Sequence, residues 1–136
     1  MSDYPVQQAV ELSDANQSSS SFQFDHVAQV VPNIADAVEW YLLHIPGSKV
    51  LFQDTTWAFM DACGARLAFV VKDQHPGHLA WRVPSALLEE LAQKYGKEIK
   101  THRDNTRSFY IEAPGDKSIE IISVEGSPWE ILNYIK

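Results

Sequence analysis

The chain has 136 residues, an apolar fraction of 45% and a net charge of −7. This length suits one domain whose core is large enough to fold without staples. The acidic balance, with no cluster of Lys and Arg, argues against nucleic-acid binding, and no apolar run reaches the roughly 18 residues of a membrane span. Cys63 is the single cysteine, which excludes an intrachain disulfide and a cysteine-based zinc cage.

The two ends of the chain differ from its middle. Residues 1–21 are polar and end in Ser18-Ser19-Ser20-Ser21, so we expect a disordered N-terminal tail. The tail lacks a basic start followed by an apolar stretch; we therefore expect no secretory signal and take the cytoplasm as the default location. Residues 126–136 form a C-terminal extension, which we expect to contain a short helix.

The first half of the expected domain covers about 22–73. A strand over 22–31 ends at Pro32, since proline cannot donate to a strand ladder. Asn33 is a good N-cap for a helix, whose apolar residues recur at helical spacing: Ile34, Ala37, Val38, Tyr41 and Leu42. Strands are then predicted over 49–53, 57–61 and 66–71.

The second half, about 76–124, repeats that order. A strand over 78–83 ends at Pro84, and Ser85 is expected to cap a helix that stops at Gly96. Strands follow at about 98–103, 107–113 and 118–124, with a turn at Pro114-Gly115. The domain, 22–125, therefore consists of two similar modules.

A short motif marks the start of each module. His26-Val27-Ala28-Gln29-Val30-Val31-Pro32 and His78-Leu79-Ala80-Trp81-Arg82-Val83-Pro84 share the pattern His-x-Ala-x-x-Val-Pro, 52 residues apart (78 − 26). An internal repeat of this length indicates two copies of one supersecondary unit. We predict an α+β fold of two βαβββ modules, with the helices covering one face of the sheet.

Alternation along the strands predicts which side chains lie on the uncovered face. His26 and Ala28, and likewise His78, Ala80 and Arg82, share a parity opposite to that of the bulky apolar residues. Glu120 lies within the apolar run Ile119, Ile121 and Ile122, where an unpaired charge would be costly. When the modules are aligned on their glycine turns, Phe69 falls opposite Glu120; a slip of one residue places Ala68 there.

Paired modules with a histidine on the first strand and a glutamate on the last resemble the vicinal oxygen chelate superfamily. This group includes glyoxalases, methylmalonyl-CoA epimerases, fosfomycin and bleomycin resistance proteins, and extradiol dioxygenases. Residues 108–120, SFYIEAPGDKSIE, are similar to the family's final hairpin, although the glycine lies one place early. The resemblance covers about 22–124 and implies a cup-shaped sheet around a divalent metal held by His26, His78 and Glu120.

The resemblance also bears on the reaction. The family's fourth ligand position falls at Ala68 or Phe69, neither of which binds metal, and this weakens the four-ligand glyoxalase and epimerase interpretations. Two histidines and one carboxylate suit non-haem Fe(II) with open positions. Similarity to the extradiol dioxygenases therefore implies an Fe(II) dioxygenase, whose metal takes two neighbouring oxygens of a small, for instance aromatic, substrate together with O₂.

Further residues are assigned candidate roles beside this metal. Tyr110 and His102 are candidates for proton transfer. Arg82 is a candidate for orienting a substrate anion, with an ion pair, for example to Glu120, as the alternative. By parity and alignment, the candidates for substrate contact are Trp57, Phe59, Arg82 and Phe69.

Two other functions stay open at this point. One is a lyase or isomerase that uses zinc, nickel, cobalt or manganese, with water in place of the missing ligand and Glu112 as the candidate base. The other is metal-free small-molecule sequestration of the bleomycin-resistance kind, which would not need the two histidines and the glutamate. The family also implies a homodimer, and no nucleic-acid or membrane partner is expected.

Overall fold

The computed structural model describes residues 21–74, 76–115 and 117–130. The expected N-terminal tail up to residue 20 and residues 131–136 of the C-terminal extension lie outside the described residues. In chain order the elements are β1 (Gln23–Val30), α2 (Ile34–His44), β2 (Ser48–Gln53), β3 (Trp57–Ala62), β4 (Ala65–Val70), β5 (His78–Arg82), α3 (Ser85–Tyr95), β6 (Lys100–Thr101), β7 (Arg107–Ala113), β8 (Lys117–Ser123) and the 3-10 turn η1 (Pro128–Glu130).

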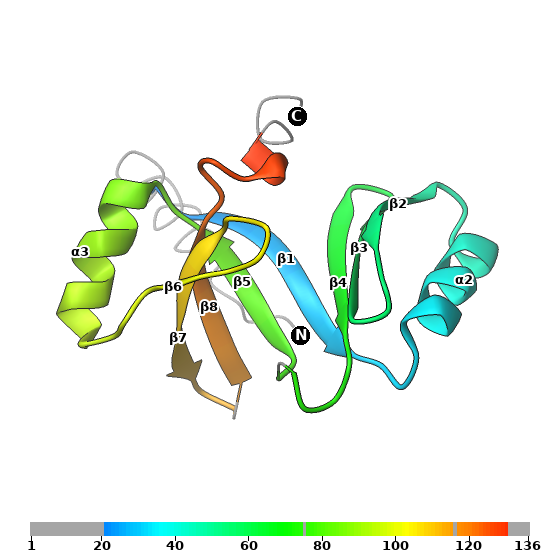
Figure 1. Ribbon diagram of the computed structural model, residues 1–136, viewed down its shortest axis with the longest axis horizontal. Helices are drawn as coiled ribbons and strands as arrows, with labels where there is room; N and C mark the ends of the chain where they lie inside the picture. The colour runs from blue at the N-terminus through cyan, green and yellow to red at the C-terminus, as the bar shows by residue number, and fades with distance from the viewer. Residues whose placement is uncertain (1–20, 75, 116, 131–136) are drawn as a thin grey trace, which may run out of the picture.

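The strands form one mixed sheet of eight, in the order β2-β3-β4-β1-β5-β8-β7-β6. Within each module the first and last strands pair in parallel, β1 with β4 and β5 with β8. The modules join through the antiparallel pair β1–β5 at the centre of the sheet. The sheet is curved, and α2 and α3 lie at its two ends on the outer side (Figure 1). The predicted α+β fold of two βαβββ modules is thereby confirmed.

The two helices begin in different ways. In α2 the Oδ1 atom of Asn33 accepts a hydrogen bond from the backbone N–H of Asp36 at 2.8 Å, as the sequence predicts. In α3 the predicted cap is wrong: Ser85 is the first helical residue, and the preceding Pro84 offers no capping side chain. The Ser85 hydroxyl is instead 2.8 Å from the hydroxyl of Ser123, which ties the start of α3 to β8.

The outer face of the sheet carries the apolar core of each module. Under α2 the buried residues are Ile34, Val38, Ala58, Met60 and Phe69. Under α3 they are Val83, Leu88, Ala92, Phe109 and Ile121. Phe69, which the sequence alignment placed against substrate, is fully buried in the first of these clusters. That expectation is wrong, because strand parity turns Phe69 toward α2 and gives the concave face to its neighbour Ala68.

The concave face holds a smaller set of apolar side chains. Ala28, Phe59 and Ala68 are buried there, with Trp57 beside them. Trp129 of η1 packs both against this set and against Ala80, Ile122 and Val124 of the second module. The C-terminal turn therefore lies over the junction of the modules (Figure 1).

The edge strand β6 is shorter than predicted. The sequence indicates a strand over 98–103, but only Lys100–Thr101 pairs with β7. The chain turns directly afterwards, with Asn105 at φ 72° and with the backbone N–H of His102 bonded to the carbonyl of Thr106. No helix within the described residues is both long and apolar enough to cross a membrane.

Candidate metal centre

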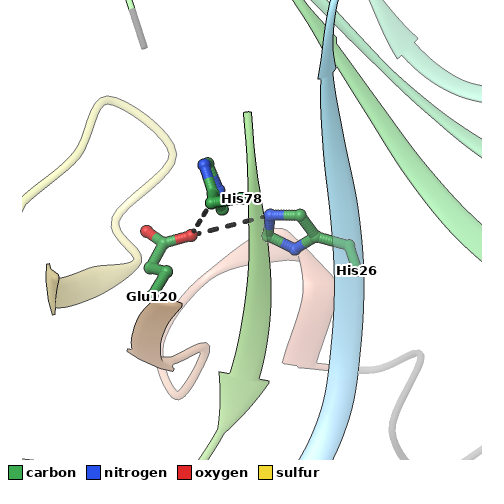
Figure 2. A group of neighbouring side chains, drawn as sticks. All are labelled: His26, His78 and Glu120. Atoms are coloured by element: carbon green, nitrogen blue, oxygen red, sulfur yellow. Dashed lines mark ion pairs between the residues drawn. The ribbon is translucent and has the colours of Figure 1, made fainter. Parts of the chain in front are cut away.

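Three buried side chains from both modules converge on the concave face (Figure 2). His26 comes from β1, His78 from β5 and Glu120 from β8, and one ligand atom from each lies within 4.8 Å of the others. The Oε1 atom of Glu120 is 3.0 Å from Nε2 of His78 and 3.6 Å from Nε2 of His26. The sequence predicted this set of three residues as metal ligands.

Strand register explains why these residues meet. Ala80 lies opposite His26 on one side and opposite Glu120 on the other. Residues directly across a ladder point to the same face, so all three side chains project to the concave side. Ala80 is itself fully buried and small, which leaves room above the centre of the sheet for the larger side chains.

The other ring nitrogen of each histidine has a fixed partner. Nδ1 of His78 lies 2.9 Å from the carbonyl oxygen of Pro76, and Nδ1 of His26 lies 2.7 Å from the Oδ2 atom of Asp25. A carbonyl oxygen only accepts, as does an ionised carboxylate, so the hydrogen-bond network assigns a proton to both Nδ1 atoms. Both Nε2 atoms are thus the ones presented to Glu120.

This arrangement fits a bound cation. Nε2 of His78 is buried and, despite lying 3.0 Å from Glu120, makes no hydrogen bond of acceptable geometry. In a neutral ring, its lone pair would face the lone pairs of a carboxylate oxygen. A positive centre, either a proton or a metal ion, removes that conflict, and two imidazoles with one carboxylate suit several divalent transition metals.

The charges around Glu120 keep it ionised. Burial would raise the pKa of this carboxyl, but its electrostatic interactions with His78 and His26, together with Ser108, lower it to about 2. For His78, burial opposes protonation, yet the carboxylate of Glu120 outweighs that effect and raises the pKa of the ring. Near neutral pH the site therefore offers a permanently anionic ligand.

Two further predicted residues lie beside Glu120. Burial and the negative charge of Glu120 both raise the pKa of Tyr110, so its hydroxyl keeps its proton. Nε2 of His102 is 2.7 Å from the hydroxyl of Ser108 and 3.7 Å from the Oε2 atom of Glu120. The fold thus brings both candidate proton-transfer groups next to the carboxylate of Glu120.

The candidate substrate residues are placed differently. Phe59 is buried, with its ring edge-on to His26 at 5.7 Å between centroids, and Trp57 lies next to it at 5.9 Å. Arg82 shares the concave face as predicted, but it does not pair with Glu120. Its guanidinium instead reaches the Oδ1 atom of Asp25 at 3.0 Å and the Oε1 atom of Gln23 at 2.7 Å.

The loops over the concave face make contacts that sequence reasoning missed. Trp129 donates from Nε1 to the Oδ2 atom of Asp104 at 2.8 Å, and its ring packs edge-on to Phe59 at 4.9 Å. Arg103 reaches back to the first module, where Nη2 is 3.4 Å from the Oδ2 atom of Asp54. A signal was available, because both acidic residues stand in an Asp-x-Thr sequence, one in each module.

Asp25 is the other residue that the sequence did not single out. Strand parity assigns it to the helix side, because its neighbour His26 faces the opposite way. A β-bulge between Phe24 and His26 breaks that alternation. Nothing in the sequence alone marks the bulge, although a carboxylate beside a candidate ligand was a visible sign.

Comparisons with solved structures identify the architecture. The chain matches the glyoxalase/bleomycin resistance protein/dioxygenase superfamily member from Vibrio splendidus 12B01 at 9% identity and a TM-score of 0.53, covering 74% of this chain and 98% of that one. It has the glyoxalase/bleomycin resistance/dioxygenase fold. No protein-family profile matches the sequence, and a search of curated protein sequences gives no match.

Two other structures with this fold are similar. The E323L mutant of homoprotocatechuate 2,3-dioxygenase from Brevibacterium fuscum matches at 20% identity and a TM-score of 0.57, over 74% of this chain. The present chain spans 33% of that dioxygenase. A structure described as NAD-dependent benzaldehyde dehydrogenase from Legionella pneumophila matches at 17% identity and a TM-score of 0.59, over 71% of this chain and 96% of its own length. The vicinal oxygen chelate resemblance predicted from the sequence is supported at the level of the fold.

Proposed function

We propose that the protein is a metal-dependent enzyme of the vicinal oxygen chelate type, and specifically an Fe(II) dioxygenase acting on a small oxygenated substrate. The observation that carries the proposal is the buried set of His26, His78 and Glu120, whose ligand atoms lie within 4.8 Å of one another. Its setting supports this, since a fold shared with a homoprotocatechuate 2,3-dioxygenase holds the set on its concave face.

In this proposal, His26, His78 and Glu120 hold the metal through two imidazole nitrogens and one carboxylate oxygen. Such an ion, when bound, supplies Lewis acidity and open positions for substrate oxygens and O₂. Glu120 is ionised and both histidines carry a proton on Nδ1, so the Nε2 atoms are the ones that can bind a metal; an ion bound there would displace any proton held on Nε2 of His78.

The remaining candidate residues would transfer protons or form the wall of the substrate site. Tyr110 keeps its hydroxyl proton beside Glu120 and can donate a hydrogen bond to an oxygen of the substrate. His102 is linked to Ser108 and lies close to the same carboxylate, a position from which it can take up or release a proton. Phe59, Trp57 and Trp129 form an aromatic wall that excludes water and favours a flat substrate.

Three further expectations belong to the proposal. The ligand is a small molecule, the protein forms a homodimer, and the location is the cytoplasm. Arg82 remains a candidate for orienting substrate only if it leaves Asp25 and Gln23, with which it bonds here. The dimer is checked by sedimentation equilibrium.

The test begins with elemental analysis of protein purified without oxygen or chelators. About one iron per chain in the unchanged protein, lost in His26→Ala, supports the proposal. His44→Ala is the matched control: His44 ends α2, stacks on Trp40 on the outer side, and should not affect metal content. Oxygen uptake is then measured with catechols and keto acids.

Other outcomes redirect the assignment. Stoichiometric zinc, nickel, cobalt or manganese without oxygen uptake favours the lyase or isomerase. Glu112 is exposed on β7 and is then the base to examine first. Absence of metal from both proteins, even after reconstitution, overturns both enzymatic functions and leaves small-molecule sequestration, which His26→Ala would not impair.

A further inference from the structure

A buried carboxylate stands directly behind the candidate metal centre. Asp25 is 4% exposed, and its two carboxylate oxygens bind different partners. Oδ2 accepts from Nδ1 of His26 at 2.7 Å, while Oδ1 accepts from Nη1 of Arg82 at 3.0 Å and lies 3.5 Å from Nη1 of Arg66. Asp25 therefore links the candidate ligand His26 to the two buried guanidinium groups.

The bulge in β1 makes this contact possible. Phe24 lies opposite Trp81 and packs edge-on to it on the helix side, with 5.2 Å between ring centroids. His26 lies opposite Ala80 on the concave side, and Asp25 is the extra residue between these two pairs. A regular strand would turn consecutive side chains to opposite faces, whereas the bulge lets Asp25 and His26 share one face.

The neighbouring charges hold Asp25 in its anionic form. Asp25 lies between the two guanidinium groups and His26, with Nη1 of Arg82 at 3.0 Å and Nη1 of Arg66 at 3.5 Å from Oδ1. Arg82 is further fixed by Gln23, which accepts from its Nη2 at 2.7 Å. Nη1 of Arg66 donates a long hydrogen bond of 3.5 Å to Oδ1 of Asp25, while Nη2 of Arg66 is buried and makes no hydrogen bond within the described residues.

The two histidines are thus held in unlike ways. Nδ1 of His78 meets a neutral backbone carbonyl, that of Pro76, whereas Nδ1 of His26 meets a charged carboxylate. A carboxylate on the far ring nitrogen fixes the tautomer and ring orientation of a metal-binding histidine and makes it a stronger ligand. His26 is also the only one of the three ligands that the first module supplies.

We propose that Asp25 is the positioning residue of the metal centre: anchored by Arg66 and Arg82, it keeps the proton of His26 on Nδ1 and aims Nε2 at the cation. The inference rests on the proposed function in that a divalent metal is the target of Nε2. The tautomer itself is a property of the metal-free protein and is tested separately.

The first test needs no variant and no metal. Long-range ¹H–¹⁵N correlation spectra of the metal-free protein, at about pH 9 and so above the ordinary histidine pKa of roughly 6.5, report which nitrogen carries the proton. His26 is expected to carry it on Nδ1. His78, whose Nδ1 faces a carbonyl oxygen, serves as the internal reference for that tautomer. A proton on Nε2 of His26 overturns the inference.

The second test uses variants matched in charge. Asp25→Asn alone would leave two guanidinium groups buried without a carboxylate, so it is combined with Arg66→Gln to keep the local net charge unchanged. Arg66→Gln alone is the control, since it preserves the contact between Asp25 and His26. Affinity for Co(II) is measured by competition with a chromogenic chelator, alongside the visible spectrum of the Co(II) protein.

The double variant should bind Co(II) about 10–100-fold more weakly than the unchanged protein, which has the same net charge, and more weakly than the Arg66→Gln control, with altered d–d bands. Equal affinity and unchanged bands in a folded double variant overturn the inference. If the double variant does not fold, the tautomer of the unchanged protein decides. If the unchanged protein binds no metal, the proposed function fails, and the tautomer still decides whether Asp25 positions His26.

Discussion

The two modules share a backbone frame but carry different chemistry at matching places. In the first, Phe59 lies opposite Ala68; in the second, Tyr110 lies opposite Glu120. Ala68 pairs with Ala28 of β1 as Glu120 pairs with Ala80 of β5, so these positions correspond. The first module thus presents an apolar wall, and the second presents a carboxylate with a hydroxyl beside it.

On the concave face of the sheet, the first module contributes mainly apolar packing and the second contributes the polar candidate groups. Phe59 and Ala68 are buried on the first module's side of the concave face, and Phe59 contacts His26, the one candidate ligand of the three that this module supplies. A second carboxylate at Ala68 would have given the centre four protein ligands. With a methyl group at this position the candidate centre has three possible protein ligands, which would leave more coordination positions open on a bound metal than four would.

The loops over the concave face also use matching residues for different contacts in the two modules. Asp54 accepts hydrogen bonds from the backbone N–H and the hydroxyl of Thr56, and Asp104 does the same for Thr106. The second carboxylate oxygen then takes a different partner in each module, Arg103 for Asp54 and the indole of Trp129 for Asp104. One local turn therefore serves two different contacts over the concave face.

The largest expected effect comes from removing the carboxylate that only the second module has. Glu120→Gln keeps the shape of the side chain but loses the charge that two imidazole ligands require to hold a divalent cation. We expect affinity for Co(II) or Fe(II) to fall by more than about 100-fold, since changes behind the ligands alone cost about 10–100-fold. Glu112→Gln, an exposed carboxyl two residues beyond Tyr110 on β7, is the control; an equal loss there would refute the assignment.

Making the second module resemble the first is the next largest change. Phe59 occupies the position in the first module that Tyr110 occupies in the second. The fold should therefore tolerate the phenylalanine ring of Tyr110→Phe. We expect metal content to stay constant and turnover to fall about 100-fold or more, because a proton donor beside the centre is lost. Undiminished turnover with the best substrate would remove Tyr110 from the mechanism.

Placing a carboxyl in the first module at the position that corresponds to Glu120 tests whether a fourth ligand can reach the candidate metal centre. Ala68→Glu introduces a carboxyl where Ala28 and Phe59 pack, at a cost to the metal-free protein of about 2 kcal/mol, typical of burying an unpartnered polar group. Added Zn(II) should raise Tm more than it does for the unchanged protein, because a fourth ligand is available. Ala68→Gln, which supplies a weaker ligand, is the comparison, and equal Zn(II)-induced shifts would contradict the correspondence with Glu120.

The smallest effect concerns the turn of the first module. Hydrogen bonds from Thr56 lower the pKa of Asp54 from 3.8 to about 2. A lowered pKa in the folded state stabilises the protein above pH 3.8, and this contribution is lost as the pH falls toward about 2. The difference in Tm between the unchanged protein and Asp54→Asn should therefore shrink over that interval. A difference that is independent of pH would show that the charge of Asp54 is irrelevant to stability.

Much of the fold was predictable because local signals agreed with one another. The strand predicted over 107–113 has those bounds in the structure, and the helix after Asn33 begins at Ile34 as its N-cap indicates. The candidate ligand set came from the resemblance to the vicinal oxygen chelate superfamily, and the repeat and strand parity located its positions in this sequence. These inferences depend on regular alternation and regular spacing, which most of the sheet obeys.

The failures occur where that regularity ends. A single bulge reverses the parity of Asp25 and so concealed the partner of both His26 and Arg82. Alignment on glycine turns left a choice between Ala68 and Phe69, which the pairing of β4 with β1 and with β3 resolves in favour of Ala68. The position of Trp129 depends on the path of the last turn across both modules, and no local pattern in the sequence encodes that path.

The division of the ligands between modules has a consequence for kinetics. His26 belongs to one module and the other two ligands to its neighbour, and the three side chains are only 11%, 4% and 5% exposed. An ion bound between them would be shielded from solvent and would leave through an opening of the β1–β5 pairing or of the loops above the site. The rate at which a chelator removes the metal should therefore level off as chelator concentration rises. The plateau would measure the rate at which the protein opens around the site.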